Sequence, residues 1–227
     1  MIIDVAGLPV ELSRKRIKNL NLRINHQGEV KVSAPLRLPL DLIHRYLNEK
    51  RDWIDTHRIK LQAQPPICSL KFETGESHFF LGKRYDLIVH TATPLNHITI
   101  DEQSIYCFIN YGATVIERQT LLQQWYRQQM HGILPNLIKK WEEIIGVQVQ
   151  TYHIKVMKTR WGSCNSSKQR VSLNLNLIQK PLNCLEYVIV HELVHLLEAS
   201  HNSRFYALMS QFMPDWKYYK KQLTCPI

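Results

Sequence analysis

The stretch NCLEYVIVHELVHLLEASHNSRFY, residues 183–206, is the part of this chain from which the rest is best understood. It contains the pattern H-E-x-x-H at His191, Glu192 and His195, and a further histidine, His201, follows. Residues four apart lie on one face of a helix, so His191 and His195 point the same way and can hold one metal ion. Glu192 lies one step round the helix, where it reaches a water on that ion without being a ligand.

The segment that carries this pattern is apolar on most sides, which predicts a buried helix. Asn183 is the expected N-cap, with Glu186 three residues later completing a capping box. Polar side chains buried on one arc of such a helix need a partner, and a divalent cation supplies one. The alternative is a set of core or surface histidines without a metal, and the third histidine favours the metal site.

The third ligand is open to two interpretations. A catalytic zinc ion takes three protein ligands and leaves one position free. His201 completes the set if the chain bends after about Ala199. Glu198 shares a face with His191 on a straight helix, but it would lie about 10 Å further along the axis. We therefore favour His201 as the ligand, with Glu198 orienting a histidine or an arginine.

Composition narrows the class of protein. The chain has 227 residues, 44% of them hydrophobic, which allows one large domain or two small ones. We find no apolar run of about 18 residues and no secretion signal, and so expect a cytoplasmic protein without membrane segments. Five cysteines without a C-x-x-C pair argue against a disulfide framework and a cysteine-ligated zinc site. Cys164, in the turn after Trp161, is the cysteine closest to the candidate chemistry.

The chain is strongly basic, with a net charge of +10. Such an excess suits an anionic partner, and weak association with nucleic acid is one interpretation, although proteins that bind no such partner are often equally basic. The densest cluster is Arg14-Lys15-Arg16-Ile17-Lys18. Its charges either prevent an exposed edge strand from pairing with other chains or bind phosphate groups.

Hydrophobic periodicity along the chain predicts an α+β fold. Strands are expected within residues 1–35, 70–112, 147–160 and 171–177. One helix is expected over 39–63, ended by the linker at 64–66, and a second over 114–145, with weak points at Gly132 and Pro135. We predict a β-rich N-terminal region with one helix over residues 1–112 and a metal-binding catalytic domain over 113–227.

Several motifs together resemble those of one known family. MKTRWGSCN at 157–165, VSLNLNL at 171–177, the stretch at 185–206 and MPDW at 213–216 are similar to the YgjP-like metal-dependent hydrolases. These are grouped with the H-E-x-x-H metallopeptidases and are related to SprT-like and WLM domains. KRIKNLNLRI at 15–24, VKVSAP at 30–35, TGE at 74–76 and LGKRY at 81–85 extend the resemblance over nearly the whole chain.

The resemblance implies a zinc ion held by His191, His195 and His201, with Glu192 as the general base. It also implies a zincin-like core, in which a small antiparallel sheet packs beside the metal-binding helix. Family members are mostly grouped by fold as peptidases, and some bacterial members are described as nucleoside triphosphate (UTP) pyrophosphatases. The expected substrate is therefore a peptide or a nucleotide, and a SprT-like protease associated with nucleic acid is a further alternative.

Arg160 is a second candidate catalytic residue. It precedes the Trp161 turn, where its charge could stabilise negative charge that develops during hydrolysis. Equally, it could form an ion pair with Glu198. Lys155, Lys158 and Lys168 flank the same turn and favour a triphosphate substrate, whereas the lack of a glycine-rich phosphate loop counts against one. The polar positions of the strand at 171–177, Ser172, Asn174 and Asn176, are expected to line the cleft.

Overall fold

The computed structural model describes residues 1–25, 28–62, 70–91 and 95–224. Its contacts divide the chain into two compact units, residues 1–69 and 70–227. The boundary expected at residue 112 differs from this division, because the strands between residues 77 and 109 share a core with the helix that follows them. The linker expected at 64–66 lies outside the described residues.

The N-terminal unit is a four-stranded sheet with two helices on its apolar face. The strands run in the order β1-β2-β4-β3, with β2 and β4 parallel and the outer pairs antiparallel. Their bounds are β1 Ile2–Val5, β2 Leu8–Lys15, β3 Asn21–Ile24 and β4 Val30–Pro35. The single helix expected over 39–63 is wrong, because the chain forms α1 (Leu40–Glu49) and α2 (Arg51–Gln62) with a break at Lys50, where φ is −96° and ψ is 8°.

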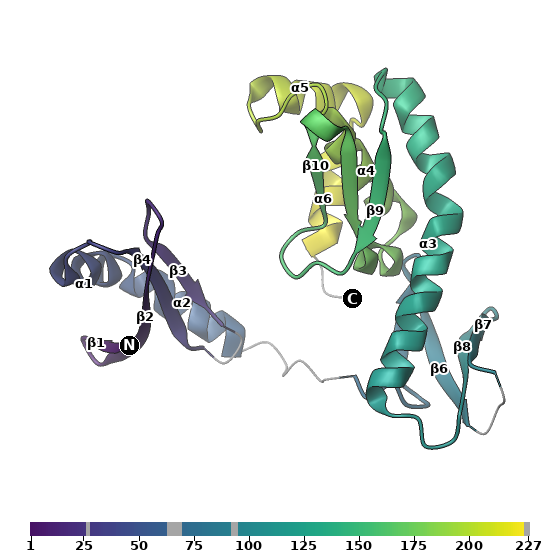
Figure 1. Ribbon diagram of the computed structural model, residues 1–227, viewed down its shortest axis with the longest axis horizontal. Coiled ribbons are helices and arrows are strands. Elements are labelled where there is room, and N and C mark those ends of the chain that lie inside the picture. The colour runs from purple at the N-terminus through teal and green to yellow at the C-terminus, as the bar shows by residue number, and fades with distance from the viewer. Residues whose placement is uncertain (26–27, 63–69, 92–94, 225–227) are drawn as a thin grey trace. The chain divides into compact units, whose positions relative to one another are not determined.

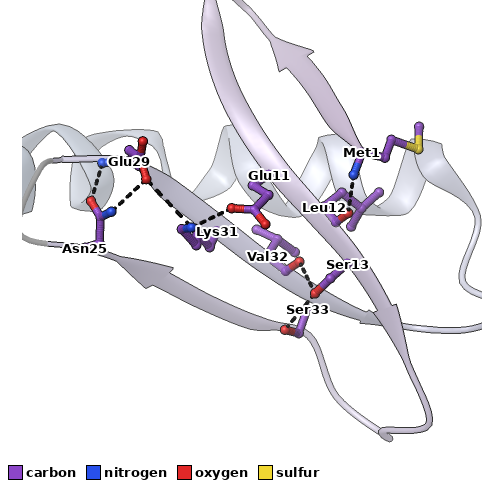
Figure 2. Close-up of polar contacts among 9 residues, drawn as sticks. All are labelled: Met1, Glu11, Leu12, Ser13, Asn25, Glu29, Lys31, Val32 and Ser33. Atoms are coloured by element: carbon purple, nitrogen blue, oxygen red, sulfur yellow. Dashed lines mark hydrogen bonds and ion pairs between the residues drawn. The ribbon is translucent and has the colours of Figure 1, made fainter.

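The other face of this sheet is polar (Figure 2). Lys31 forms ion pairs with Glu11 at 2.6 Å and Glu29 at 3.7 Å, and the Ser13 and Ser33 hydroxyls lie 3.2 Å apart (Figure 2). Within the basic cluster, Arg14 donates to the backbone carbonyls of residues 35, 36 and 38. This arginine is therefore structural, whereas the lysines and the arginine that follow it are exposed.

The second unit begins with a sheet and a long helix. The strands run in the order β5-β6-β8-β7, with bounds β5 Ser77–Phe80, β6 Lys83–Thr91, β7 His97–Ile100 and β8 Ser104–Ile109. Helix α3 (Val115–Ile145) starts at a capping box between Thr114 and Glu117 and ends at Gly146, where φ is +75°. It contacts both β7 and β8, and it continues past them to helix α4 (Figure 1).

Helix α3 is unbroken over 31 residues, although Gly132 and Pro135 lie inside it. Its buried stripe passes straight through this region, with Met130, Leu134 and Ile138 on one side of the helix. Packing along that stripe compensates for the hydrogen bond that a proline removes. The weak points predicted from the sequence therefore do not interrupt the helix.

The remaining elements surround the candidate site. Their bounds are β9 Thr151–Lys155, β10 Gly162–Asn165, η1 Ser166–Lys168, β11 Arg170–Asn174, η2 Leu175–Gln179, α4 Leu182–Val194, α5 Ser203–Phe212 and α6 Trp216–Thr224. The strand order is β10-β11-β9. The small sheet is mixed rather than purely antiparallel, because β9 runs parallel to β11. The strand expected over 171–177 stops at Asn174, whose side chain accepts from the backbone N–H of Asn176 and starts a 3-10 turn.

Helix α4 is buried among α3, α5, α6 and the small sheet, which confirms the expectation of a buried helix (Figure 1). Its N-cap is Pro181, without a side-chain hydrogen bond, so the capping box expected from Asn183 and Glu186 is wrong. Glu186 instead accepts from Lys140 Nζ and Trp141 Nε1 of α3, each at 3.0 Å. Among the described residues, no helix is both long and apolar enough to cross a bilayer.

Candidate metal centre

Three histidine side chains converge at the end of α4. His191 lies in its last turn, His195 is its C-cap, and His201 lies just before α5. Each offers one ring nitrogen, and these three atoms lie within 4.8 Å of one another. The Nε2 atoms of His191 and His201 are 3.0 Å apart. The structure therefore brings together the three residues that the sequence predicts as ligands.

The local sequence makes the bend that brings His201 back. Helix α4 ends at Val194, and Asn202 then caps α5 by accepting from the backbone N–H of Phe205 at 3.0 Å. Phe205 is fully buried, and its ring centroid lies 4.6–5.0 Å from those of all three histidines. The Phe205 ring thus packs against all three histidine rings.

His195 is held by neighbours that leave one of its nitrogens free for a ligand role. Its Nδ1 faces the backbone carbonyl of Glu198 at 3.1 Å, and Ser166 Oγ donates to the His195 carbonyl at 2.9 Å. A hydrogen bond at Nδ1 fixes the tautomer in which Nε2 can bind a metal.

Glu198, the rival ligand, is engaged elsewhere. Its carboxylate accepts from the backbone N–H of Ser200 at 3.2 Å and lies 3.9 Å from Arg204 Nη1. Among the described residues, the cluster with metal-ligand geometry contains the three histidines and not Glu198. The ion pair considered between Glu198 and Arg160 is replaced by the contact with Arg204.

The donor set fits a first-row divalent cation. Ligand nitrogens about 2.0–2.1 Å from a tetrahedral zinc ion lie about 3.3 Å from one another, close to the separation of His191 and His201. Metal binding needs neutral imidazoles. Burial, together with the neighbouring His195 and His201, lowers the pKa of His191 to about 4, and burial also lowers the pKa of His195. The cluster therefore favours the protonation state that binds a metal.

Glu192 lies beside the histidines and is only 5% exposed. Without a metal ion, burial raises the pKa of its carboxyl to about 8, and the positive charge of Arg160 acts in the opposite direction. A divalent cation held by the neighbouring histidines would lower this pKa and favour the carboxylate. The carboxylate packs directly on β10, where a Cβ atom at Gly162 would lie 2.6 Å from Glu192 Oε1 and 2.9 Å from Val188 Cγ1. Only glycine permits this approach. Gly162 is a site residue that sequence reasoning missed, although it lies in the R-W-G-S-C motif.

A cavity of about 740 Å³ opens over this cluster. The three histidines, Glu192 and Arg160 line it, together with Lys220 of α6. Sequence reasoning missed Lys220, because nothing in its local spacing connects it with the histidines. The lysines expected near the Trp161 turn, Lys155, Lys158 and Lys168, do not line the cavity. The polar positions expected to line it do not either, because Ser172 and Asn174 are buried in β11 and Asn176 is exposed in η2.

Comparison with known proteins identifies the family of this chain. The profile described as YgjP-like, metallopeptidase domain, matches residues 18–225. Curated proteins give no match. A solved structure, the metallopeptidase zymogen of Pyrococcus abyssi abylysin, is 19% identical, with a TM-score of 0.38 over 40% of this chain and 91% of that chain. Because the profile spans most of the sequence, the chain belongs to the YgjP-like family, metallopeptidase domain.

Proposed function

We propose that this protein is a zinc-dependent, peptidase-like hydrolase that attacks its substrate with an activated water molecule. The observation that carries the proposal is the meeting of three imidazole nitrogens within 4.8 Å at the wall of a cavity that Glu192 also lines. His191, His195 and His201 would hold the ion. A zinc ion bound there would lower the pKa of a water molecule and polarise the attacked oxygen.

Glu192 acts as the general base and then as the acid. Its carboxylate accepts a proton from the attacking water and returns that proton to the leaving group. The close packing of Gly162 against Glu192 supports this role, because a general base must be held within hydrogen-bond reach of the proton that it takes.

Arg160 stabilises the negative charge that develops on the substrate. It lines the cavity, and its positive charge acts on Glu192. The contact of Glu198 with Arg204 supports this role over the structural one, since it leaves Arg160 available to the cavity.

A peptide is the substrate class that the site favours. Among the described residues, strand β10 is at the edge of its sheet and pairs with β11 alone. Gly162, Ser163 and Cys164 of β10 line the cavity. An extended peptide can add to such an edge through backbone hydrogen bonds, which would present its carbonyl groups to the histidine cluster.

A nucleoside triphosphate is the second candidate substrate. Arg160 and Lys220 both line the cavity, and two cations near the histidine cluster suit a phosphate chain. The three lysines expected to bind phosphate, Lys155, Lys158 and Lys168, do not line it, so this alternative rests on Arg160 and Lys220.

The zinc-loaded protein should be screened against an extended-peptide library and a panel of nucleoside triphosphates, with the Glu192→Gln variant as control. We expect peptide cleavage that the variant lacks. Pyrophosphate release from a nucleotide, again lost in the variant, would transfer the proposal to the second candidate. Equal turnover by both forms would remove Glu192 from the mechanism.

A further inference from the structure

Asn174, the last residue of β11, is a buried polar side chain that the proposed mechanism does not use. It is 4% exposed and does not line the cavity. Its Nδ2 donates to the carbonyls of Met157 and Arg160, each at 2.8 Å. Its Oδ1 accepts from the backbone N–H groups of Met157 at 3.4 Å and Asn176 at 3.1 Å. Both the nitrogen and the oxygen of the amide are thus hydrogen-bonded.

Most of these bonds go to one loop, residues 156–161, which joins β9 to β10 and carries Arg160 and Trp161 to the cavity. The backbone N–H of Asn174 also donates to the carbonyl of Trp161 at 2.8 Å. Among the described residues, the hydrogen bonds made by residues 156–161 all go to Asn174. The loop therefore depends on one residue for its hydrogen-bonded anchoring.

We propose that Asn174 is a positioning residue, which fixes the loop at 156–161 and thereby places Arg160 at the edge of the cavity facing Glu192. The effect of Asn174 on turnover rests on the proposed function, whereas its effect on the loop does not. An asparagine is needed because only an amide offers donors to two carbonyls and an acceptor to two N–H groups at once. Aspartate would turn an oxygen towards both carbonyls, and alanine would leave buried backbone groups unpaired.

Trypsin cleavage of the metal-loaded, full-length protein tests the loop directly. Lys158 and Arg160 are exposed, so the loop offers two trypsin sites, and the rate of cutting there reports how often the loop opens. We expect Asn174→Ala and the nearly isosteric Asn174→Asp to be cut after Lys158 or Arg160 at least about tenfold faster than the wild type. If the alanine variant fails to fold, the rate of trypsin cleavage in the aspartate variant tests the proposal.

Ser172→Ala is the matched control. Ser172 lies two residues earlier on β11 and is 5% exposed, but it makes no hydrogen bond to the loop. Faster loop cleavage in the Asn174 variants, with wild-type behaviour in Ser172→Ala and unchanged metal content, supports the proposal. Unchanged cleavage in the Asn174 variants, or equally faster cleavage in Ser172→Ala, overturns it.

A double-mutant cycle tests whether Asn174 acts through Arg160. We expect Asn174→Asp to lower kcat about as much as Arg160→Ala does, on the order of 100-fold, and the double variant to be no worse than either. If the fold-losses in kcat of the two single variants multiply in the double variant, the proposed route through Arg160 is overturned. If the wild type hydrolyses no tested substrate, the proposed function fails, while the trypsin assay still judges the anchoring of the loop.

Discussion

Gly162 sets how closely β10 approaches the Glu192 carboxylate. A methyl group there would lie 2.6 Å from Glu192 Oε1, so Gly162→Ala must move either the carboxylate or the strand. We expect a loss of about 1–3 kcal/mol of unfolding free energy and a large fall in turnover, with zinc content kept. Urea denaturation, kinetics and elemental analysis measure the three quantities.

Gly132→Ala is the control for this change. Gly132 is exposed within α3, and a Cβ atom there meets nothing within 4 Å. Alanine should stabilise the helix by up to about 1 kcal/mol and leave turnover unchanged. Retained turnover in Gly162→Ala would show that the packing of β10 on Glu192 does not matter for the chemistry.

Glu192 itself is tested by Glu192→Gln. The amide is nearly isosteric but cannot accept a proton at neutral pH, so we expect turnover to fall by about 10²–10⁴-fold while zinc stays bound. Elemental analysis alongside kinetics separates the two effects. Loss of zinc together with turnover would instead indicate that Glu192 supports the metal.

At the level of residues, the sequence predicted those site residues whose positions depend on local spacing along the chain. His191 and His195 are one helical turn apart, and His201 needs only a bend, so their convergence could be predicted before the fold was known. Gly162 and Lys220 reach the cavity from β10 and α6, and these distant elements meet only through tertiary packing. The capping box failed because Glu186 has stronger partners on α3 than at its own helix end.

Between elements, Glu186 is the polar link from α4 to α3. Its carboxylate accepts from Trp141 Nε1, which is largely buried, and from Lys140, which is half exposed. Glu186→Ala leaves the indole N–H unpaired and should cost about 1–3 kcal/mol. Glu186→Gln keeps an acceptor for the indole and should cost clearly less, since an exposed ion pair contributes little. Urea denaturation compares the variants, and equal losses would contradict this assignment.

Element types were easier to predict than element ends. Periodicity identified α3 and α4, because long apolar stripes survive packing. The same periodicity joined α1 and α2 into one helix, since it does not detect the non-helical backbone at Lys50. It also extended the last strand to residue 177, where the side chain of Asn174 turns the chain into a 3-10 helix. Side-chain hydrogen bonds of this kind override a hydrophobic pattern.

For the whole molecule, His78 couples stability to pH. It is 5% exposed, its Nε2 has no hydrogen-bond partner among the described residues, and it lies 3.6 Å from Glu76, whose carboxylate already accepts from two backbone N–H groups. Burial lowers the pKa of His78 below its ordinary value of 6.5, and Glu76 opposes this only in part.

The lowered pKa of His78 determines in which direction folding stability changes with pH. Below pH 6.5 the unfolded chain takes up a proton at His78 more readily than the folded one, so folding stability falls as the pH drops towards the lowered folded-state pKa. We expect His78→Leu to lose less unfolding free energy than the wild type between about pH 7 and pH 5. Denaturation curves at both pH values measure the difference, and parallel losses would contradict it.

The division into two units was the feature of the whole chain that the sequence located least well. Both units contain sheets, so composition does not change at residue 69, and the contacts that join β5–β8 to α3 are formed between distant residues. The net charge of +10 remains the only basis for the predicted association with nucleic acid.

The central claim is that three imidazoles hold one catalytic cation. X-ray absorption at the zinc edge, with elemental analysis of the same sample, tests it most directly. We expect about one zinc per chain, with three imidazole nitrogens at about 2.0–2.1 Å and one further light ligand, and loss of the metal in His201→Ala but not in Glu198→Ala. A protein that binds no metal, or that loses it equally in both variants, would contradict the account.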